Sequence, residues 1–332
     1  MIKLFRETFR ILEQHQKIGI LRIQIIILLT ALTEVAGVAT IGSFMGLVSN
    51  PSQVYEVGML GSLYQFSGSN TEQEFLIIAG VGAVIILLLS AIVATLALRY
   101  IYHFAQRIGA EIASNLFDHY IASDWIFHTQ NNSSKLIANV SSECSRVTTG
   151  IIVPLLIMNA RIVTAASIIM FLLWINFLVA LMGSLIFGAV YSAIFYFVKS
   201  KLVANGERLT EHQNIRIRTM SEGFGGIKDI LLMSRSEQFK NRFRESSLIY
   251  GHAIGTQQTL SEIPKYWVEL LAFGTMVLLV LFLLLTAGGN FSVIVPTLSI
   301  FAMASYKLIP LFQQIYFYMS GIKFSQSALQ SI

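Results

Sequence analysis

The sequence predicts an all-α integral membrane protein with six long transmembrane helices, and three observations support this fold class. The 332-residue chain is 55% hydrophobic, with a mean hydropathy of +0.67 and only 12% charged residues. Soluble domains usually carry about 25% charged residues. Six stretches of the chain reach the roughly 20 mostly apolar residues that a spanning helix needs. Almost all Lys and Arg residues lie between these stretches.

The six apolar stretches are separated by connections of very different length. They cover residues 18–48, 75–98, 151–174, 177–198, 268–287 and 291–312. Only Ile175-Asn176 separates the third stretch from the fourth, which predicts a tight hairpin. Thr286 to Asn290 joins the fifth to the sixth, and its small and polar residues are typical of a turn.

The positions of the basic residues predict how the spans are oriented. Lys and Arg gather in three blocks with five, four and eleven members, at residues 1–22, 99–150 and 199–267. The connections at 49–74, around Asn176 and at 287–292 contain neither residue. Because cytoplasmic loops retain Lys and Arg, we expect an even number of crossings, both termini in the cytoplasm and two large cytoplasmic excursions.

Residues 1–17 have the pattern of an amphipathic helix. Apolar residues recur there at helical spacing, with basic residues between them: Ile2, Phe5, Phe9 and Leu12, and Lys3, Arg6 and Arg10. A basic amphipathic helix of this kind lies along the membrane surface. We therefore expect an interfacial elbow helix before the first span, and the segment lacks the cleavage site of a signal peptide.

The two cytoplasmic excursions, 99–150 and 199–267, are far longer than the connections of about 2–8 residues usual in helical bundles. Apolar residues continue through them at helical spacing, so we expect each to be a helical hairpin that extends the membrane helices. Arms of about 25 residues would project on the order of 35 Å. The expected tips are 124–134, rich in Asn and Ser, and 221–230, where three glycines interrupt the helix. Glu222 is expected near the start of a following short helix, where an acidic side chain is favoured.

This arrangement resembles the transmembrane domain of an exporter-type ABC transporter. The resemblance rests on Glu222-Gly-Phe-Gly-Gly-Ile-Lys-Asp-Ile230, followed by Glu237-Gln-Phe239 and Arg242-Phe243, and on Asn132-Ser133, Leu136 and Glu143 after the first tip. Within the family, the likeness is greatest to bacterial lipid-linked oligosaccharide flippases. The residues that carry it are Ser299-Ile-Phe-Ala-Met-Ala-Ser-Tyr-Lys-Leu-Ile-Pro310, Ile263-Pro-Lys265 and Gly80-Val-Gly82.

The resemblance implies one transmembrane domain over 1–332, with the elbow helix at 1–17, the six-span bundle at 18–312 and a cytoplasmic extension of the sixth helix at 313–332. It also implies a homodimer in the bacterial inner membrane, with ATP and Mg bound by partner nucleotide-binding domains. The chain contains no G-x-x-x-x-G-K-[ST] phosphate loop, so we expect no cofactor and no catalytic residue within it. The ATPase is expected either fused downstream of Ile332 or on a separate chain.

In this family the hairpin tips contact the ATPase, and the resemblance assigns the contacts to two groups of residues. The first group is Trp125, Ile126, Phe127 and His128, and the second is Phe224, Gly225, Gly226, Ile227 and Lys228. The alternative is that the aromatic residues pack only within the tips.

Three charged residues are expected at membrane depth: Glu34, Arg161 and Lys307. A Lys or Arg at a span centre costs about 2.5–3.5 kcal/mol, so such residues usually face an interior or a watery cavity. The resemblance to flippases implies a cationic cavity for a pyrophosphate-linked glycan, with Lys307 and Lys265 at matching positions. Ser90 stands where that group has an arginine. The alternatives are internal pairing, for example of Arg161 with Glu34, or snorkelling to the interface.

The composition argues against several other classes of function. The six histidines are scattered without metal-ligand spacing, and the stripe of basic and aromatic residues typical of nucleic-acid binding is missing. A membrane enzyme would need clustered acidic or His residues, and a channel would need a filter-like loop. The leading alternative function is therefore within transport, as an exporter of a peptide, a drug or another lipid.

Overall fold

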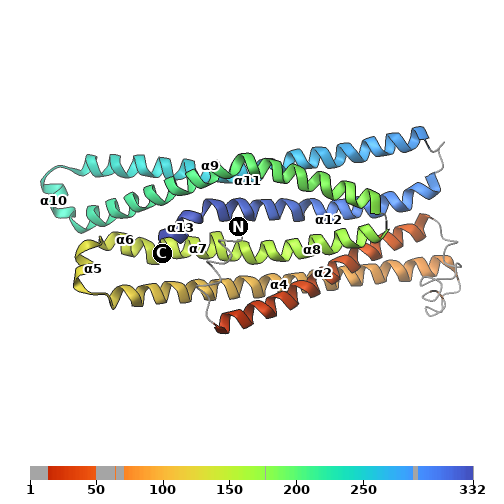
Figure 1. The fold of residues 1–332 in the computed structure, drawn as a ribbon, viewed down its shortest axis with the longest axis horizontal. Coiled ribbons are helices and arrows are strands. Elements are labelled where there is room, and N and C mark those ends of the chain that lie inside the picture. The colour runs from red at the N-terminus through yellow and green to blue at the C-terminus, as the bar shows by residue number, and fades with distance from the viewer. Residues whose placement is uncertain (1–13, 50–63, 65–70, 176, 287–290, 332) are drawn as a thin grey trace.

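The computed structural model describes residues 14–49, 64, 71–175, 177–286 and 291–331. Every regular element in these ranges is a helix, which confirms the predicted all-α class for the described residues. Figure 1 shows that the long helices run side by side along the longest axis of the molecule.

The six predicted apolar stretches fall on the six long helices. These are α2 (Gln14–Ser49), α4 (Glu72–Ile121), α8 (Val153–Ile175), α9 (Phe177–Gly225), α11 (Ser236–Thr286) and α12 (Phe291–Phe324). Among the described residues, three helical segments are long and apolar enough to cross a membrane: Ile18–Val48, Glu72–Ile121 and Ser133–Ile175. The number of six crossings therefore stays a prediction.

Three helices are much longer than a membrane is thick. α4, α9 and α11 contain 50, 49 and 51 residues, which at 1.5 Å per residue gives about 75 Å against a hydrocarbon core of about 30 Å. The expected extension of membrane helices into long hairpins is thus present. Of the predicted elbow helix, residues 1–13 lie outside the described ranges, and 14–17 form the first turn of α2.

The main core joins α2, α4, α8 and α12. Its deeply buried large side chains include isoleucines from all four helices or their extensions: Ile23, Ile27, Ile101, Ile108, Ile151, Ile157 and Ile322. Many other large apolar residues of α2 and α4 are exposed, among them Leu21, Leu32, Ile77 and Leu88. An apolar exterior around an apolar core is what a helix in lipid requires, because lipid tails are as apolar as leucine.

The return leg of the first hairpin is irregular. Between α6 (Ser133–Ala138) and α8, two π-helical turns, η2 (Asn139–Glu143) and η3 (Thr148–Ile152), flank the single α-turn α7 (Cys144–Val147). Such π-turns are rare and are frequent at functional sites. A Cβ atom on Gly109 of α4 would overlap the Thr148 side chain, so α4 and η3 approach as closely as glycine permits.

α11 contains one proline within its helix, Pro264. Proline has no N–H, so it leaves the carbonyl four residues earlier, that of Leu260, without its helical donor. The hydroxyl of Tyr316 on α12 donates a hydrogen bond to this carbonyl at 3.0 Å. The Tyr316 ring is buried against Tyr191 and Phe195 of α9, so three helices meet at this point.

Candidate functional site

The first hairpin ends in the short helix α5 (Trp125–Gln130), as expected from residues 124–134. Trp125 and Ile126 are exposed, Trp125 by 79%. Phe127 turns inward instead, and its ring lies 5.7 Å from that of Tyr120 and 5.4 Å from that of His128. The first predicted contact group therefore divides into two outward apolar side chains and an inward anchor.

The asparagines at this tip explain why the chain turns here. Asn131 donates from Nδ2 to the Phe127 carbonyl at 2.9 Å, and Asn132 caps α6 by accepting from the Ser134 amide at 2.9 Å. Short polar side chains that bond to nearby backbone stabilise helix ends. These hydrogen bonds explain why the helices end at the Asn- and Ser-rich tip expected at 124–134.

The second hairpin ends in α10 (Ile227–Leu232). The interruption between α9 and α10 is shorter than the three glycines predicted. Gly223 and Gly225 are still helical in α9, and only Gly226 lies between the two helices. Glu222 is also not at the start of a short helix. It lies in the last turns of α9, where it accepts a hydrogen bond from Arg218 at 2.6 Å and lies 3.7 Å from Arg242 on α11. These contacts hold the end of α9 helical, which corrects both expectations.

A tight turn with a left-handed residue follows α10. Ser234 has φ of 56°, its amide donates to Leu231, and the Arg235 amide donates to Ile230. This pair of bonds is the Schellman pattern, in which the left-handed position is usually glycine. The turn sends the chain directly into α11.

The second tip exposes a larger apolar surface than the sequence indicated. Phe224 is 78% exposed and Ile227 is exposed as well. Leu231, Leu232 and Met233 add further exposed side chains that the sequence analysis did not single out. Only Ile230 of α10 is buried. Several exposed large apolar side chains on and beside a short helix are typical of an interaction site.

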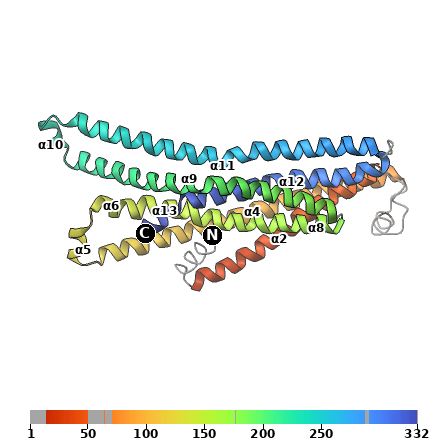
Figure 2. The same cartoon turned by 45° about the horizontal axis from the view of Figure 1, so that its top comes forward.

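Both tips lie at the same end of the molecule. Figures 1 and 2 place α5 and α10 at one end of the longest axis. We define Trp125 and Ile126 of α5, with Phe224, Ile227, Leu231, Leu232 and Met233 around α10, as the tip surface.

Lys307 of α12 pairs with Glu34 of α2. The Lys307 Nζ atom donates to Glu34 Oε2 at 2.6 Å, between residues 273 positions apart. The side chains are 30% and 16% exposed. The suggested pairing of Arg161 with Glu34 is therefore wrong, because α12 rather than α8 places a cation beside this carboxylate.

Among the described residues, the other two predicted cavity residues, Arg161 and Lys265, form no ion pair of this kind. In the described ranges, the buried Nε of Arg161 has no hydrogen-bond partner, and its guanidinium acts electrostatically on Tyr318. Lys265 follows Pro264 and lies over the ring of its neighbour Tyr266, with Nζ 5.9 Å from the centroid. Of the four predicted cavity residues, the structure thus joins Lys307 to Glu34, whereas Arg161 and Lys265 interact with other residues.

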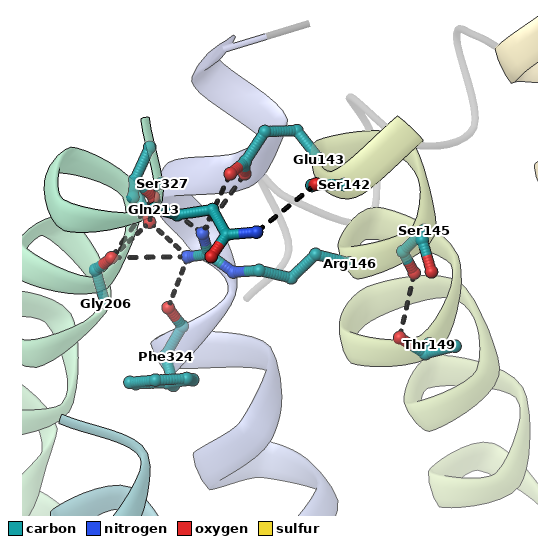
Figure 3. Close-up of polar contacts among 10 residues, drawn as sticks. Ser142, Glu143, Ser145, Arg146, Thr149, Gly206, Gln213, Phe324 and Ser327 are labelled. Atoms are coloured by element: carbon teal, nitrogen blue, oxygen red, sulfur yellow. Dashed lines mark hydrogen bonds and ion pairs between the residues drawn. The ribbon is translucent and has the colours of Figure 1, made fainter. Parts of the chain in front are cut away.

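Another polar site centres on Arg146 of α7 (Figure 3). Its Nη1 donates to Glu143 Oε2 at 3.1 Å and to Thr210 Oγ1 at 2.6 Å. Its Nη2 donates to Ser327 Oγ at 2.5 Å and to the carbonyls of Gly206 and Phe324, each at 3.3 Å. We call Glu143, Arg146, Gly206, Thr210, Phe324 and Ser327 the Arg146 network.

Burial sets the electrostatics of this network. Glu143 is fully buried, and burial raises the pKa of its carboxyl while the Arg146 guanidinium opposes that shift. Burial likewise lowers the pKa of Arg146, against the attraction of Glu143. The neighbouring Cys144 is a buried free thiol, and burial followed by the Glu143 charge raises its pKa. A buried thiol with a raised pKa is unreactive, so Cys144 adds no chemistry beside the network.

A cavity of about 350 Å³ borders the network. Its lining includes Arg146, Leu209, Tyr250, Gln257 and Phe317, which come from four different helices. The network therefore lies where the two hairpins meet α12, beside a space that side chains do not fill.

Residues 37–308 match the family described as ABC transporter transmembrane region. The chain belongs to this family. A bacterial Atm1-family ABC exporter with ATP bound has a similar structure, with a TM-score of 0.69 and 12% sequence identity. The match covers 95% of this chain and 52% of that exporter, so the chain spans about half of the exporter's length. At this identity the likeness supports the fold alone.

Several residues of this ABC transmembrane region were not found by sequence reasoning. Glu143 was noted only as part of a motif, and Arg146 only as one basic residue of a block, whereas the structure makes them the centre of a network. Gly206 carried no signal except its identity, yet a Cβ there would overlap the Phe324 carbonyl oxygen. An acid three residues before an arginine in a predicted cytoplasmic helix is the one local pattern that indicates this site.

Proposed function

We propose that this chain is the membrane-spanning half of an ATP-driven exporter or flippase that moves a lipid-linked substrate across the bacterial inner membrane. The observation that carries the proposal is the tip surface, which presents apolar side chains at one end of two hairpins that continue helices about 75 Å long. A pair of such surfaces on helices continuous with the membrane spans suits the transmission of movement from a soluble partner. Both termini are cytoplasmic in this proposal.

The proposed partner is a nucleotide-binding domain, fused downstream or on a separate chain, that binds ATP and Mg. Trp125 and Ile126 would contact it from α5, and Phe224 and Ile227 from α10. Phe127 and His128 would hold α5 in place, Gly226 would set the bend between α9 and α10, and Gly225 and Lys228 would lie at the edge of the contact. A homodimer would bring two such pairs of tips together.

The proposed substrate carries a phosphate group, for example a pyrophosphate-linked oligosaccharide. Arg161 supports this proposal because its buried Nε has no hydrogen-bond partner among the described residues, and a cation in a membrane span usually faces an interior or a watery cavity. Lys307 supports the proposal in another way, because its ammonium already binds a carboxylate, that of Glu34 at 2.6 Å, and could bind a substrate anion in the same manner. A substrate phosphate would take the place of Glu34 as the partner of Lys307, and Lys265 would add positive charge at the cytoplasmic side.

The direct test is reconstitution of the chain with its ATPase in proteoliposomes. Transport of a pyrophosphate-linked glycolipid is compared with transport of a peptide, a drug and a phosphate-free lipid, each with and without ATP. We expect ATP-dependent movement of the glycolipid and no movement of the others. ATP-dependent movement of only a peptide or a drug would contradict the proposed substrate and favour the alternative exporter function.

A matched pair of variants refines this test. Arg161→Ala removes the guanidinium whose Nε has no hydrogen-bond partner among the described residues, and Arg99→Ala removes an exposed arginine of α4 near the end of the second predicted span. We expect glycolipid transport to fall in the first variant and to persist in the second. Equal rates in both would remove Arg161 from the substrate site.

A further inference from the structure

The end of α12 is held by a side chain from the first hairpin. Phe324 is the last residue of α12, so no backbone N–H of that helix can donate to its carbonyl. The Arg146 Nη2 atom donates to this carbonyl at 3.3 Å, and Arg146 lies over the Phe324 ring at 5.8 Å. A cation that bonds the final carbonyls is a favourable C-terminal cap. Arg146 therefore caps the C-terminal end of α12.

The same guanidinium also holds the second hairpin. It donates to the Gly206 carbonyl and to Thr210 on α9, while Ser327 of α13 (Gln326–Ser331) donates to Gly206 at 2.9 Å. The planar fork of arginine suits such simultaneous bonds, which a lysine ammonium cannot reproduce. One side chain thus joins α7, α9 and the α12–α13 junction, as Figure 3 shows.

The backbones around the fork are packed too closely for the junction to adjust on its own. A Cβ on Gly206 would overlap the Phe324 carbonyl, and a Cβ on Gly150 would overlap the Ser325 hydroxyl. Glu143 is buried against Arg146 and fixes its orientation from η2. Packed contacts of this kind change between discrete arrangements rather than deform continuously.

The position of the network along the molecule suggests what it does. The hairpins carry the tip surface at one end, and α12 carries Lys307 about 17 residues before Phe324, which is about 25 Å along a helix. We infer that Arg146 is a positioning residue that makes the two hairpins and α12 move together, so that movement at the tip surface reaches the Lys307–Glu34 pair. This inference rests on the proposed function, because it assumes an ATPase at the tips.

The first measurement does not depend on transport. In the complete transporter, hydrogen exchange of the α13 amides is compared between wild type, Arg146→Ala and Arg107→Ala. Arg107 forms an exposed pair with Glu111 on α4 and serves as the matched control. We expect faster exchange at α13 only in Arg146→Ala. Unchanged exchange there would overturn the inference, because the junction would then be held without the network.

The second measurement is the number of substrate molecules moved per ATP hydrolysed. We expect this ratio to fall about fivefold or more in Arg146→Ala, the lower end of coupling between distant sites, with ATP hydrolysis retained. Arg146→Lys should give an intermediate ratio, and Arg107→Ala the wild-type ratio. Ser327→Ala, which removes one acceptor and keeps the ion pair, should lower the ratio less and provides a test if Arg146→Ala does not fold.

The outcomes separate two kinds of failure. If wild type moves substrate with ATP and the ratio is unchanged in Arg146→Ala and Ser327→Ala, the network is only a structural anchor and the inference fails alone. If wild type hydrolyses no ATP and moves no substrate, the proposed function fails and the inference falls with it.

Discussion

The Tyr316 hydroxyl donates a hydrogen bond at 3.0 Å to the carbonyl of Leu260, which is the carbonyl that Pro264 leaves without a donor. A tyrosine on α12 thus replaces a helical hydrogen bond of α11. Because Tyr316 is 1% exposed, water cannot take its place. The relationship links the stability of one helix to the position of another.

The first prediction concerns this bond. Tyr316→Phe should destabilise the protein by about 1–3 kcal/mol, because the part-buried Leu260 carbonyl loses the donor that replaces the missing N–H of Pro264. In a Pro264→Ala background the helix regains an N–H for Leu260, so the same change should cost much less. Thermal unfolding of the four proteins in detergent measures this coupling. The same cost in both backgrounds would show that the hydroxyl does not compensate for Pro264, and Tyr266→Phe, at an exposed position, is the control.

The second prediction concerns Lys307 and Glu34. Glu34→Gln frees the Lys307 ammonium from its counter-charge, so the apparent KM for a phosphate-bearing substrate should fall. Lys307→Ala should raise KM, and Lys307→Arg should keep most of the wild-type behaviour because the charge remains. Initial transport rates at several substrate concentrations decide the matter. Wild-type rates in both Lys307 variants would exclude this residue from the substrate site.

The third prediction concerns the turn after α10. Ser234 has φ of 56°, and a non-glycine residue there costs about 1–2 kcal/mol. Ser234→Gly should therefore slow hydrogen exchange of the α10 amides. Ser236→Gly, placed in the first turn of α11, should not slow exchange, because glycine in a helix is unfavourable. Faster exchange of α10 in Ser234→Gly would show that the left-handed turn is not a source of strain.

The fourth prediction concerns pH and Glu143. Its pKa is raised in the folded state by burial, which outweighs the opposing effect of Arg146. Between the unfolded value of about 4.3 and the raised value, the folded state binds more protons than the unfolded state, so stability falls as pH rises. Relative to Glu143→Gln, wild type should gain stability as the pH is lowered from 7 through this window. A relative loss on acidification would mean that Arg146 dominates and that the pKa is depressed.

The helices and the positions of both tips could be predicted from the sequence because they depend on local signals. Apolar runs, helical periodicity and the confinement of Lys and Arg are read within a few turns of helix. Asn131 and Asn132, which cap helix ends at the first tip, are also local signals of this kind. The structure confirms the helical character of the predicted apolar stretches where it describes them.

The pairings between helices could not be predicted in the same way. Glu34 had two cationic candidates in the predicted spans, and both α8 and α12 pack against α2. Only the three-dimensional positions of the side chains select Lys307 over Arg161. The Arg146 network depends on Gly206 and Phe324, which are distant in sequence and contribute backbone carbonyls. No side-chain pattern indicates such acceptors, because every residue has a carbonyl.

The extent of the tip surface was also underestimated, for a physical reason. The glycines drew attention to residues 223–226, but Gly223 and Gly225 are helical, because glycine disfavours a helix by only about 1 kcal/mol. The contacts of Glu222 with Arg218 and Arg242 offset that cost. The exposed side chains therefore continue past the glycines to Met233.

The most direct test of the central claim, that the tip surface connects this membrane domain to an ATPase, is the ATP-driven transport rate of the variant with both Phe224→Ala and Ile227→Ala. Truncated anchors at an interface cost about 2 kcal/mol each, so transport should fall steeply while the protein keeps its thermal stability. Leu248→Ala, at an exposed position of α11 away from the tips, should transport like wild type. Wild-type ATPase binding and transport in the double variant would contradict the account.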